Sequence, residues 1–155
     1  MRLFNLNKNI WLIAPTNSRF FILLPLFYTI IIQILTGFPR SETLRGISAS
    51  ELIIRFSEEL FDYPFWLQDL SHFPLFFLFS WVWAWYLRRA SRGKNRLFLT
   101  ITLTSGYAIL NELTQIYIPQ RFPSLGDITT NLLGVTTAIS IHTFVLNRCS
   151  LKRNQ

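Results

Sequence analysis

Two short stretches of the sequence place carboxylates, amides, a histidine and an arginine within or beside apolar segments. The first stretch is Asp69 to His72, and the second runs from Glu112 to Asn131. Polar groups of this kind are costly to bury among apolar side chains, so they need partners or a function. The two stretches supply seven candidate site residues: Asp69, His72, Glu112, Gln115, Arg121, Asp127 and Asn131.

The pair best suited to proton transfer is Glu112 and His72. A glutamate in an apolar environment is a candidate general acid or base, and histidine exchanges protons near neutral pH. If the protein is an enzyme, Glu112 and His72 are therefore the predicted catalytic residues. The other polar residues are predicted to contact the ligand: Asp69, Gln115, Arg121, Asp127 and Asn131.

Structural roles are the alternative for the same residues. Glu112 and Arg121 can form an ion pair that fixes a loop, which sets geometry more than stability. Asp127 can cap a helix, alone or with Ser124 in a Ser-x-x-Asp capping box. Asn131 can form an interhelical hydrogen bond. The functional and structural hypotheses both stay open at this point.

The sequence predicts no metal site and no cofactor. Its two histidines, His72 and His142, are expected at opposite ends of the helices, which argues against a closed zinc site. A hard cation on Asp69, Glu112 and Asp127 is a weaker alternative. The chain also lacks a Gly-rich phosphate loop and a His-Glu-x-x-His motif.

Four apolar segments are expected to hold these residues in a membrane, as one all-α domain over residues 1–155. Half of the residues are hydrophobic, 15% are charged, and the mean hydropathy is +0.32, which is too apolar for an average soluble domain. Helices of about 26–33 Å match a hydrocarbon layer of about 30 Å. The predicted transmembrane helices are 20–36, 72–87, 97–118 and 128–147.

Charge asymmetry predicts the topology of these helices. The N-terminal residues, the loop 88–96 and the C-terminal tail are rich in Lys and Arg, whereas the connection 37–71 carries three arginines against six carboxylates. Basic residues accumulate on the cytoplasmic side of membrane proteins. Both termini are therefore predicted to be cytoplasmic, and the candidate site is predicted to lie near the outer surface of the cytoplasmic membrane. The same argument accounts for the net charge of +7 without a nucleic-acid partner.

Two amphipathic stretches are expected to lie on the membrane surface. Residues 1–18 form the first. In the connection 37–71, Ser48 and Glu51 match a capping box, and apolar residues at helical spacing follow them. This pattern predicts an amphipathic outer helix between the first two spans.

The second span is expected to begin close to His72. Asp69 or Ser71 would cap its start. Pro74 would fall in its first turn, where a missing N–H costs little. Asp69 and His72 would then share one face of this helix start, because they are three residues apart.

A face of small residues on segment 128–147 is expected to pack against segment 97–118. Asn131, Gly134 and Ala138 lie on this face, and small residues let helices approach closely. The packing would bring Asn131 next to Glu112 or Gln115.

The two polar stretches resemble the signature of the VanZ-like family. The second stretch reads Glu112-x-x-Gln115, Pro119-x-Arg121, Ser124-x-x-Asp127, then Asn131 and Gly134. The first resembles the family's Asp-Lys-x-x-His-like element, and reads Asp69-Leu70-Ser71-His72, with one residue fewer between the aspartate and the histidine. Leu70 replaces the lysine, and Gln120 stands where the family often has glycine. The resemblance covers about residues 60–140.

The resemblance implies a small multi-pass protein of the bacterial cytoplasmic membrane. The founding member of the family is associated with low-level resistance to the lipoglycopeptide teicoplanin. Membrane lipids, a lipid-linked envelope precursor or a lipoglycopeptide are therefore the expected partners, and no nucleic acid is expected. The sequence does not set the ligand or the oligomeric state.

Three functions remain open, and geometry separates them. A non-enzymatic envelope protein that binds an amphiphilic ligand requires a cavity at the site. A membrane-embedded enzyme requires in addition that Glu112 and His72 lie within hydrogen-bond reach at that cavity. A structural or partner-binding four-helix protein requires a tight Glu112–Arg121 pair and no cavity.

Overall fold

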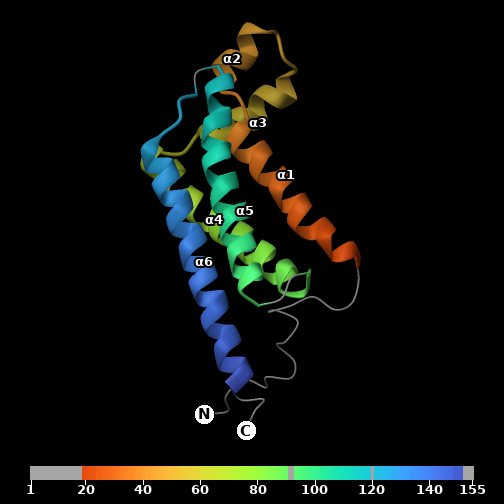
Figure 1. Cartoon of the computed structure of the whole chain (residues 1–155). Coiled ribbons are helices and arrows are strands. Elements are labelled where there is room, and N and C mark those ends of the chain that lie inside the picture. The colour runs from red at the N-terminus through yellow and green to blue at the C-terminus, as the bar shows by residue number, and fades with distance from the viewer. Residues whose placement is uncertain (1–18, 91–92, 120, 152–155) are drawn as a thin grey trace, which may run out of the picture.

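Helices make up the regular structure in the computed structural model, which describes residues 19–90, 93–119 and 121–151; no strand occurs among these residues. The long helices lie side by side and alternate in direction (Figure 1). They are α1 (Leu23–Gly37), α4 (Phe65–Ala90), α5 (Gly93–Thr114) and α6 (Leu125–Leu151). The expected surface segment 1–18 lies outside the described residues.

The shorter elements gather toward one end of these helices. α2 (Ser41–Gly46) and α3 (Glu51–Phe61) lie at the end that α1 and α5 reach (Figure 1). The short 3₁₀ helix η3 (Gln115–Tyr117) extends α5 at the same end, while η2 (Arg19–Ile22) precedes α1. The all-helical prediction is confirmed for the described part of the chain.

Proline sets where two of the long helices stop. The residue before a proline is disfavoured in helical conformation. Phe38 is extended before Pro39, and α1 ends at Gly37. Ile118 is likewise extended before Pro119. The segment expected to be helical over 97–118 therefore ends its α-helix at Thr114 and closes with the tighter turn of η3.

Three described helices are long and apolar enough to cross a membrane. They contain the candidate spans Phe20–Gly37, Trp66–Arg88 and Leu125–Arg148. α5 is long enough, with 22 residues, but its threonines and the neighbouring Asn111 and Glu112 lower its hydropathy, and it is not among them. Membrane-type helices are thus confirmed for three of the predicted segments. The fourth span and the sidedness of the ends stay predictions.

The start of α4 differs from the expectation. α4 begins at Phe65, and the N–H groups of Leu67 and Gln68 already bond to Pro64 O, at 2.9 and 3.1 Å. Asp69 and Ser71 therefore do not cap the helix but lie inside it. Pro64 directly precedes this start, and its carbonyl accepts the first hydrogen bonds of the helix.

Pro74 is the second difference in α4, because it lies in the helix interior rather than in the first turn. A proline there removes one backbone hydrogen bond, which neighbouring groups in a membrane helix tolerate. His72 consequently sits two turns into α4, deeper among the helices than the sequence indicated.

The predicted amphipathic helix is present as α3, with a different cap. Its N-cap is Ser50, whereas Ser48 lies in the preceding turn with φ of 55°. Ile54 and Ser57 are buried, and Ser57 Oγ donates to Pro39 O at 2.9 Å. Leu52 on the other face is 78% exposed. An exposed apolar face is what an interfacial helix offers to a membrane.

The close approach between α4 and α6 corrects the predicted helix pairing. A Cβ added at Gly134 would lie 2.5 Å from Phe73 O and 3.0 Å from Phe77 N. At Gly134 the small-residue face of α6 therefore packs against α4 rather than α5, whereas Asn131 on the same face does reach Glu112 on α5. α4 and α6 share the most extensive contact among the described elements. The main apolar core lies beside this contact and consists of Ile32, Phe76, Phe79, Trp83, Leu87, Ala108, Val135 and Ile139.

Candidate functional site

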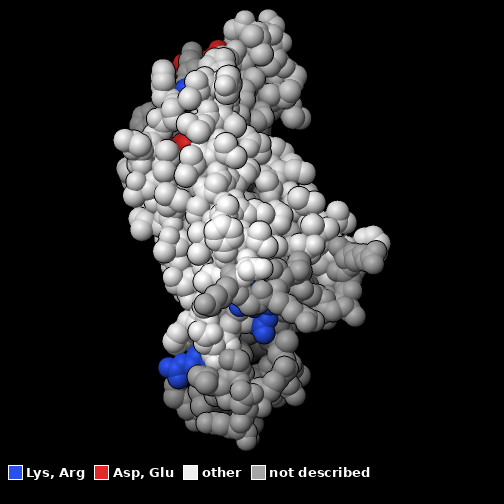
Figure 2. Space-filling view, in the orientation of Figure 1, with Lys and Arg blue, Asp and Glu red and all other residues white. Residues whose placement is uncertain are grey.

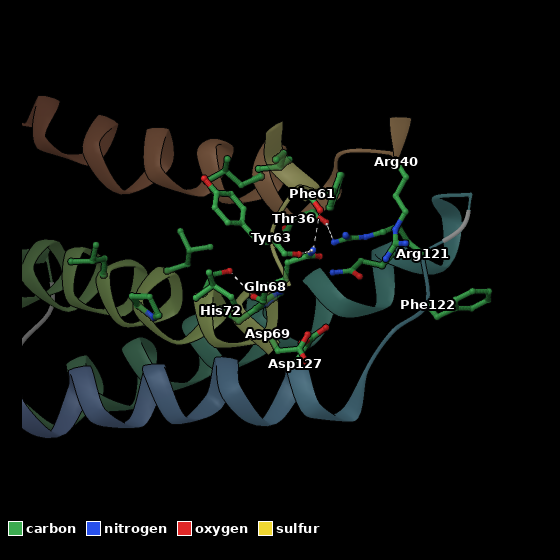
Figure 3. Close-up of a pocket in the computed structure, with 18 residues that line it drawn as sticks. Thr36, Arg40, Phe61, Tyr63, Gln68, Asp69, His72, Arg121, Phe122 and Asp127 are labelled. Carbon is green, nitrogen blue, oxygen red and sulfur yellow. Dashed lines mark hydrogen bonds between the residues drawn. The ribbon is translucent and has the colours of Figure 1, made fainter. Parts of the chain in front are cut away.

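A cavity of about 630 Å³ opens near the end of the molecule that carries α2 and α3 (Figure 3). α1, α3, α4 and the segment before α6 all contribute to its wall. One part of the wall is polar, and its ionisable side chains are Arg40, Asp69, His72, Arg121 and Asp127. Another part is apolar and includes Leu35, Leu60, Leu67, Leu75 and Leu78. The cavity is therefore amphipathic.

A buried polar cluster lies directly behind the polar wall. Glu112 has no exposed surface, and its Oε1 accepts from Asn131 Nδ2 at 3.2 Å and from Gln115 Nε2 at 3.4 Å. Asn131 Oδ1 lies 3.0 Å from His72 Nδ1. The predicted proximity of Asn131 to Glu112 is confirmed. α4, α5 and α6 each supply one member of this chain of contacts.

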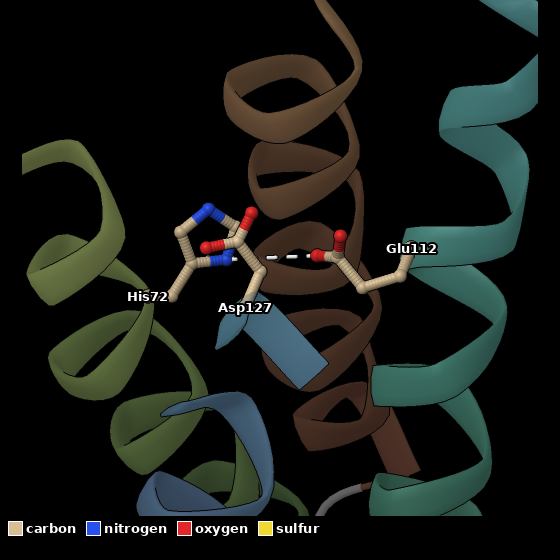
Figure 4. Close-up of side chains that lie close together, drawn as sticks. All are labelled: His72, Glu112 and Asp127. Atoms are coloured by element: carbon tan, nitrogen blue, oxygen red, sulfur yellow. Dashed lines mark ion pairs between the residues drawn. The ribbon is translucent and has the colours of Figure 1, made fainter. Parts of the chain in front are cut away.

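His72 connects the buried cluster to the cavity. Its Nδ1 lies 3.7 Å from Glu112 Oε1, and its other ring nitrogen points away from Glu112 (Figure 4). His72 is buried but lines the cavity, whereas Glu112 does not. An imidazole held in this way can pass a proton between a buried carboxylate and a bound molecule. Of these two residues, only His72 therefore borders the cavity.

Asp127 adds a second carboxylate to the cluster. One donor atom each from His72, Glu112 and Asp127 lies within 4.8 Å of the others. Asp69 lies beside Asp127 on the cavity wall, and the two carboxyl groups face one another (Figure 3). Three carboxylates therefore surround one histidine.

Ser124 caps the start of α6, so the Asp127 side chain is not needed as a cap and faces the cluster. Ser124 Oγ accepts from the backbone N–H of Gly126 at 3.1 Å and from that of Asp127 at 3.4 Å. Ser124 thus caps α6, which is the usual role of serine at this position. Asp127 lies in the first turn of α6, where the helix dipole favours a negative charge. The capping role proposed for Asp127 belongs to Ser124.

Arg121 does not pair with Glu112, which overturns the structural ion-pair hypothesis. Its Nη2 donates to Thr36 O at 2.8 Å, and its guanidinium lies 5.1 Å from the centre of the Phe61 ring. Thr36 O is available because the last carbonyls of a helix lack partners within it. Burial, and then the neighbouring Arg40, lower the pKa of Arg121, while Glu112 and Asp127 act in the opposite direction.

The structure brings all seven predicted residues to one end of the helices, in two layers. Five of them line the cavity: Asp69, His72, Gln115, Arg121 and Asp127. Glu112 and Asn131 form the layer behind. The pairing in that layer comes from contacts between α5 and α6.

Sequence reasoning missed several residues of this site. Arg40 lines the cavity, and its guanidinium lies 5.9 Å from the centre of the Phe61 ring. A basic residue at the end of an apolar segment, inside an otherwise acidic connection, was the signal for it. Asn111 was missed as well, although an asparagine in an apolar helix is unusual; its Oδ1 accepts from Thr36 Oγ1 at 2.7 Å. The contact of Asn111 with Thr36 ties α1 to α5, next to Glu112.

These observations define an all-helical protein of the membrane type, with an amphipathic cavity beside a buried carboxylate, amide and imidazole cluster. The chain belongs to the VanZ/LLP1 family, whose family model matches residues 20–146. No curated protein and no solved structure matches the chain. The family resemblance read from the two polar stretches is thereby confirmed.

Proposed function

We propose that this protein binds an amphiphile with an anionic head group, in the cavity between α1, α3 and α4. The observation that carries the proposal is the amphipathic wall, which sets Arg40, Arg121 and His72 opposite a row of leucines. A volume of about 630 Å³ fits the usual range of about 300–1,000 Å³ for ligand pockets.

The arginine pair is the expected site of the head group. Arg40 and Arg121 both place their guanidinium groups against Phe61. Two like charges at one aromatic ring repel each other, and an anion between them would relieve that repulsion. Arg121 Nε is buried and has no hydrogen-bond partner among the described residues. A phosphate or carboxylate oxygen would accept from it, with the forked geometry that arginine provides.

The apolar part of the wall would take the hydrophobic portion of the ligand. Leu35 on α1 and Leu75 and Leu78 on α4 lie on it. Leu78 is about half exposed, so this surface continues to the outside of the helices. A lipid chain could then extend from the cavity into the surrounding bilayer. Lipid-linked envelope precursors and lipoglycopeptides are amphiphiles of this general kind.

We further propose four transmembrane helices with both termini cytoplasmic, including α5. Four of the residues that lower the hydropathy of α5 are buried within the helix bundle: Thr100, Thr104, Asn111 and Glu112. Most of its exposed side chains are apolar and include Phe98, Ile101, Ile109 and Leu110, although Thr102 and Thr114 are also exposed. Lipid would therefore meet an apolar surface on α5 as well.

Charge supports the proposed direction of the helices. On the face shown in Figure 2, acidic atoms occur toward the end that carries α2 and α3, and most of the basic atoms lie toward the other end. By the positive-inside bias, the second end would be cytoplasmic. The cavity would then open at the outer leaflet.

A cysteine in the loop before α6 tests this topology. Phe122 is 83% exposed, so Phe122→Cys in a Cys149→Ser background should react with an impermeant thiol reagent in intact cells. Reaction only after lysis would contradict the outer position of the site. A cysteine at Arg148, which is exposed at the opposite end of α6, is the matched position and should react only after lysis.

Filling the cavity tests the binding proposal. Ser71 lines the cavity, whereas Ser140 is exposed on α6 away from it. Ser71→Trp should abolish binding of a fluorescent phosphatidic acid to the purified protein, measured by anisotropy, and Ser140→Trp should leave it unchanged. Equal binding by both variants would contradict the proposal. If the amphiphile is teicoplanin, expression should raise drug tolerance, and Ser71→Trp should remove this effect.

A second candidate function is acid–base catalysis on the bound amphiphile. The observation that favours it is that His72 both lines the cavity and lies 3.7 Å from the buried Glu112. His72 would exchange the proton with the substrate, and Glu112, with Asn131, would orient the ring and stabilise its charged form. Catalysis predicts that a chemically altered lipid leaves the protein, whereas binding alone predicts that mass spectrometry recovers the same lipid unchanged.

A further inference from the structure

His72, Glu112 and Asp127 converge from three different helices, α4, α5 and α6 (Figure 4). Each offers one donor atom, and the three atoms all lie within 4.8 Å of one another. Donors held about 2.0–2.2 Å from a first-row metal ion lie roughly 3–4 Å apart. The 3.7 Å between His72 Nδ1 and Glu112 Oε1 already falls in this range, and small side-chain rotations would bring Asp127 to the same distance.

Apart from His72, no basic side chain in the described part of the chain forms an ion pair with this cluster. Neither Glu112 nor Asp127 forms an ion pair with a lysine or an arginine in the part of the chain that the structure describes. Buried charges need close partners, because removal from water costs several kcal/mol per ion. The cluster thus holds two carboxylates that a divalent cation would neutralise.

Hydrogen bonding leaves the same two carboxylates incomplete. Glu112 is fully buried, and its Oε2 has no hydrogen-bond partner among the described residues. Asp127 Oδ1 is also a buried atom without a hydrogen-bond partner there. Both carboxylates point toward His72 (Figure 4). The Glu112 oxygen without a partner is Oε2, whereas Oε1 is the oxygen that lies 3.7 Å from His72 Nδ1. Buried carboxylate oxygens without a donor leave coordination capacity that a bound cation would use.

We propose that His72 Nδ1 and one carboxylate oxygen each from Glu112 and Asp127 bind a single divalent transition-metal cation. Nδ1 carries no proton in the metal-bound state, so the bond to the metal replaces its hydrogen bond to Asn131 Oδ1. The imidazole favours a transition-metal ion over Ca²⁺ or Mg²⁺, and the two carboxylates suit Mn²⁺ or Zn²⁺. This donor set differs from the hard-cation set of the sequence analysis, because His72 takes the place of Asp69. Asp69 lies next to Asp127 and adds negative charge that favours a cation.

The position of the cluster makes such a cation accessible from the cavity. His72 and Asp127 line the cavity, so an ion between them would have coordination positions directed toward a bound molecule. Three protein ligands with an open position are the usual arrangement of a catalytic metal site. The site needs only these three side chains, so it stands or fails independently of which amphiphile the cavity binds.

Manganese binding to the purified full-length protein tests this proposal. After removal of metals with a chelator, Mn²⁺ is titrated in detergent and the free ion is measured by electron paramagnetic resonance. We expect saturable binding of one ion per chain, and competition by Zn²⁺. Asp127→Asn should weaken binding at least about tenfold, a loss that even an outer partner of a metal ligand causes. This variant keeps the shape of the side chain.

Controls separate loss of the site from loss of the fold. Glu59 is an exposed carboxylate on α3 outside the cluster, and Glu59→Gln should bind Mn²⁺ like the wild type. Size-exclusion chromatography and circular dichroism must show that Asp127→Asn is folded. Absence of saturable Mn²⁺ binding, or equal affinity in Asp127→Asn and the wild type, would overturn the proposal. The phosphatidic acid titration is repeated with and without chelator. It shows whether amphiphile binding and metal binding fail separately.

Discussion

The two buried histidines of this protein lie in opposite chemical surroundings. His72 is 7% exposed and His142 is 3% exposed, so burial does not distinguish them. His72 contacts Asn131 and lies within 3.7 Å of Glu112. His142 packs edge-on against Trp81, with ring centres 5.2 Å apart.

The cavities beside the two histidines differ in the same way. His142 lines a smaller cavity of about 310 Å³, whose only charged lining residue in the described part of the chain is Arg96. The cavity beside His72 is about twice as large and carries both carboxylates and arginines. A histidine among carboxylates can bind a cation together with them, whereas the aromatic ring and the arginine near His142 add no metal ligand of that kind. The neighbours of a buried histidine, rather than its burial, therefore decide what it can do.

Replacing each histidine in turn should give the largest difference in Mn²⁺ affinity between the two surroundings. His72→Ala deletes a proposed metal ligand, so Mn²⁺ affinity should fall by roughly 10–100-fold or more. His142→Ala should leave Mn²⁺ affinity as in the wild type, because no described carboxylate joins it in a cluster of potential ligands. The electron paramagnetic resonance titration described above measures both. Similar losses in the two variants would show that the difference in surroundings has no functional meaning.

The general composition of the site could be predicted from the sequence, because polar residues inside apolar segments are conspicuous. Helical spacing and the alternation of helix direction place Glu112 and Asn131 at one level, and their hydrogen bond follows. Which of these residues faces the cavity could not be predicted. That depends on the rotation of α5 in the bundle, which buries Glu112 completely and leaves contact with the cavity to His72.

The details of helix pairing and helix ends were also beyond the sequence pattern. Small residues at Gly134 and Ala138 predicted a close approach, but any of the neighbouring helices satisfies that pattern. The backbone of α4 at Phe73 is the partner. The polar residues Gln68 and Asp69 resembled a loop before a span, although they lie within α4. Polarity alone does not separate a loop from the polar face of a helix that borders a cavity.

Replacing an arginine at each end should give an intermediate contrast. Arg121→Gln removes a charge-assisted hydrogen-bond donor, worth about 1.5–3 kcal/mol, so phosphatidic acid should bind at least about tenfold more weakly. The affinity of Arg121→Lys for phosphatidic acid should fall between those of the wild type and Arg121→Gln, since lysine keeps the charge but not the forked geometry. Fluorescence anisotropy measures the affinities.

Arg96→Gln is the matched variant at the other end, because Arg96 lines the smaller cavity beside His142. Its affinity for phosphatidic acid should equal that of the wild type. If Arg96→Gln weakens binding as much as Arg121→Gln does, our assignment of the anionic ligand to the larger cavity beside His72 is wrong. If neither variant changes the affinity, the head group does not contact arginine at either end.

The smallest effect on the site is expected from a substitution at the contact between α4 and α6. A methyl group at Gly134 would lie 2.5 Å from Phe73 O, so Gly134→Ala should lower the stability by about 1–3 kcal/mol through overpacking. Gly106→Ala is the matched control, because a Cβ there meets nothing within 4 Å, and alanine stabilises a helix interior by about 0.5–1 kcal/mol relative to glycine. Thermal unfolding in detergent, followed by circular dichroism, measures the difference.

The same pair of glycine variants tests whether the α4–α6 spacing positions the cluster. His72 precedes Phe73 on α4, and Asn131 lies about one turn before Gly134 on α6, so pushing these helices apart would lengthen the contact between His72 and Asn131. Mn²⁺ affinity should therefore fall in Gly134→Ala, but less than in Asp127→Asn, because all three donor side chains remain. Unchanged affinity together with lowered stability would mean that α5, rather than the α4–α6 contact, determines the geometry of the cluster.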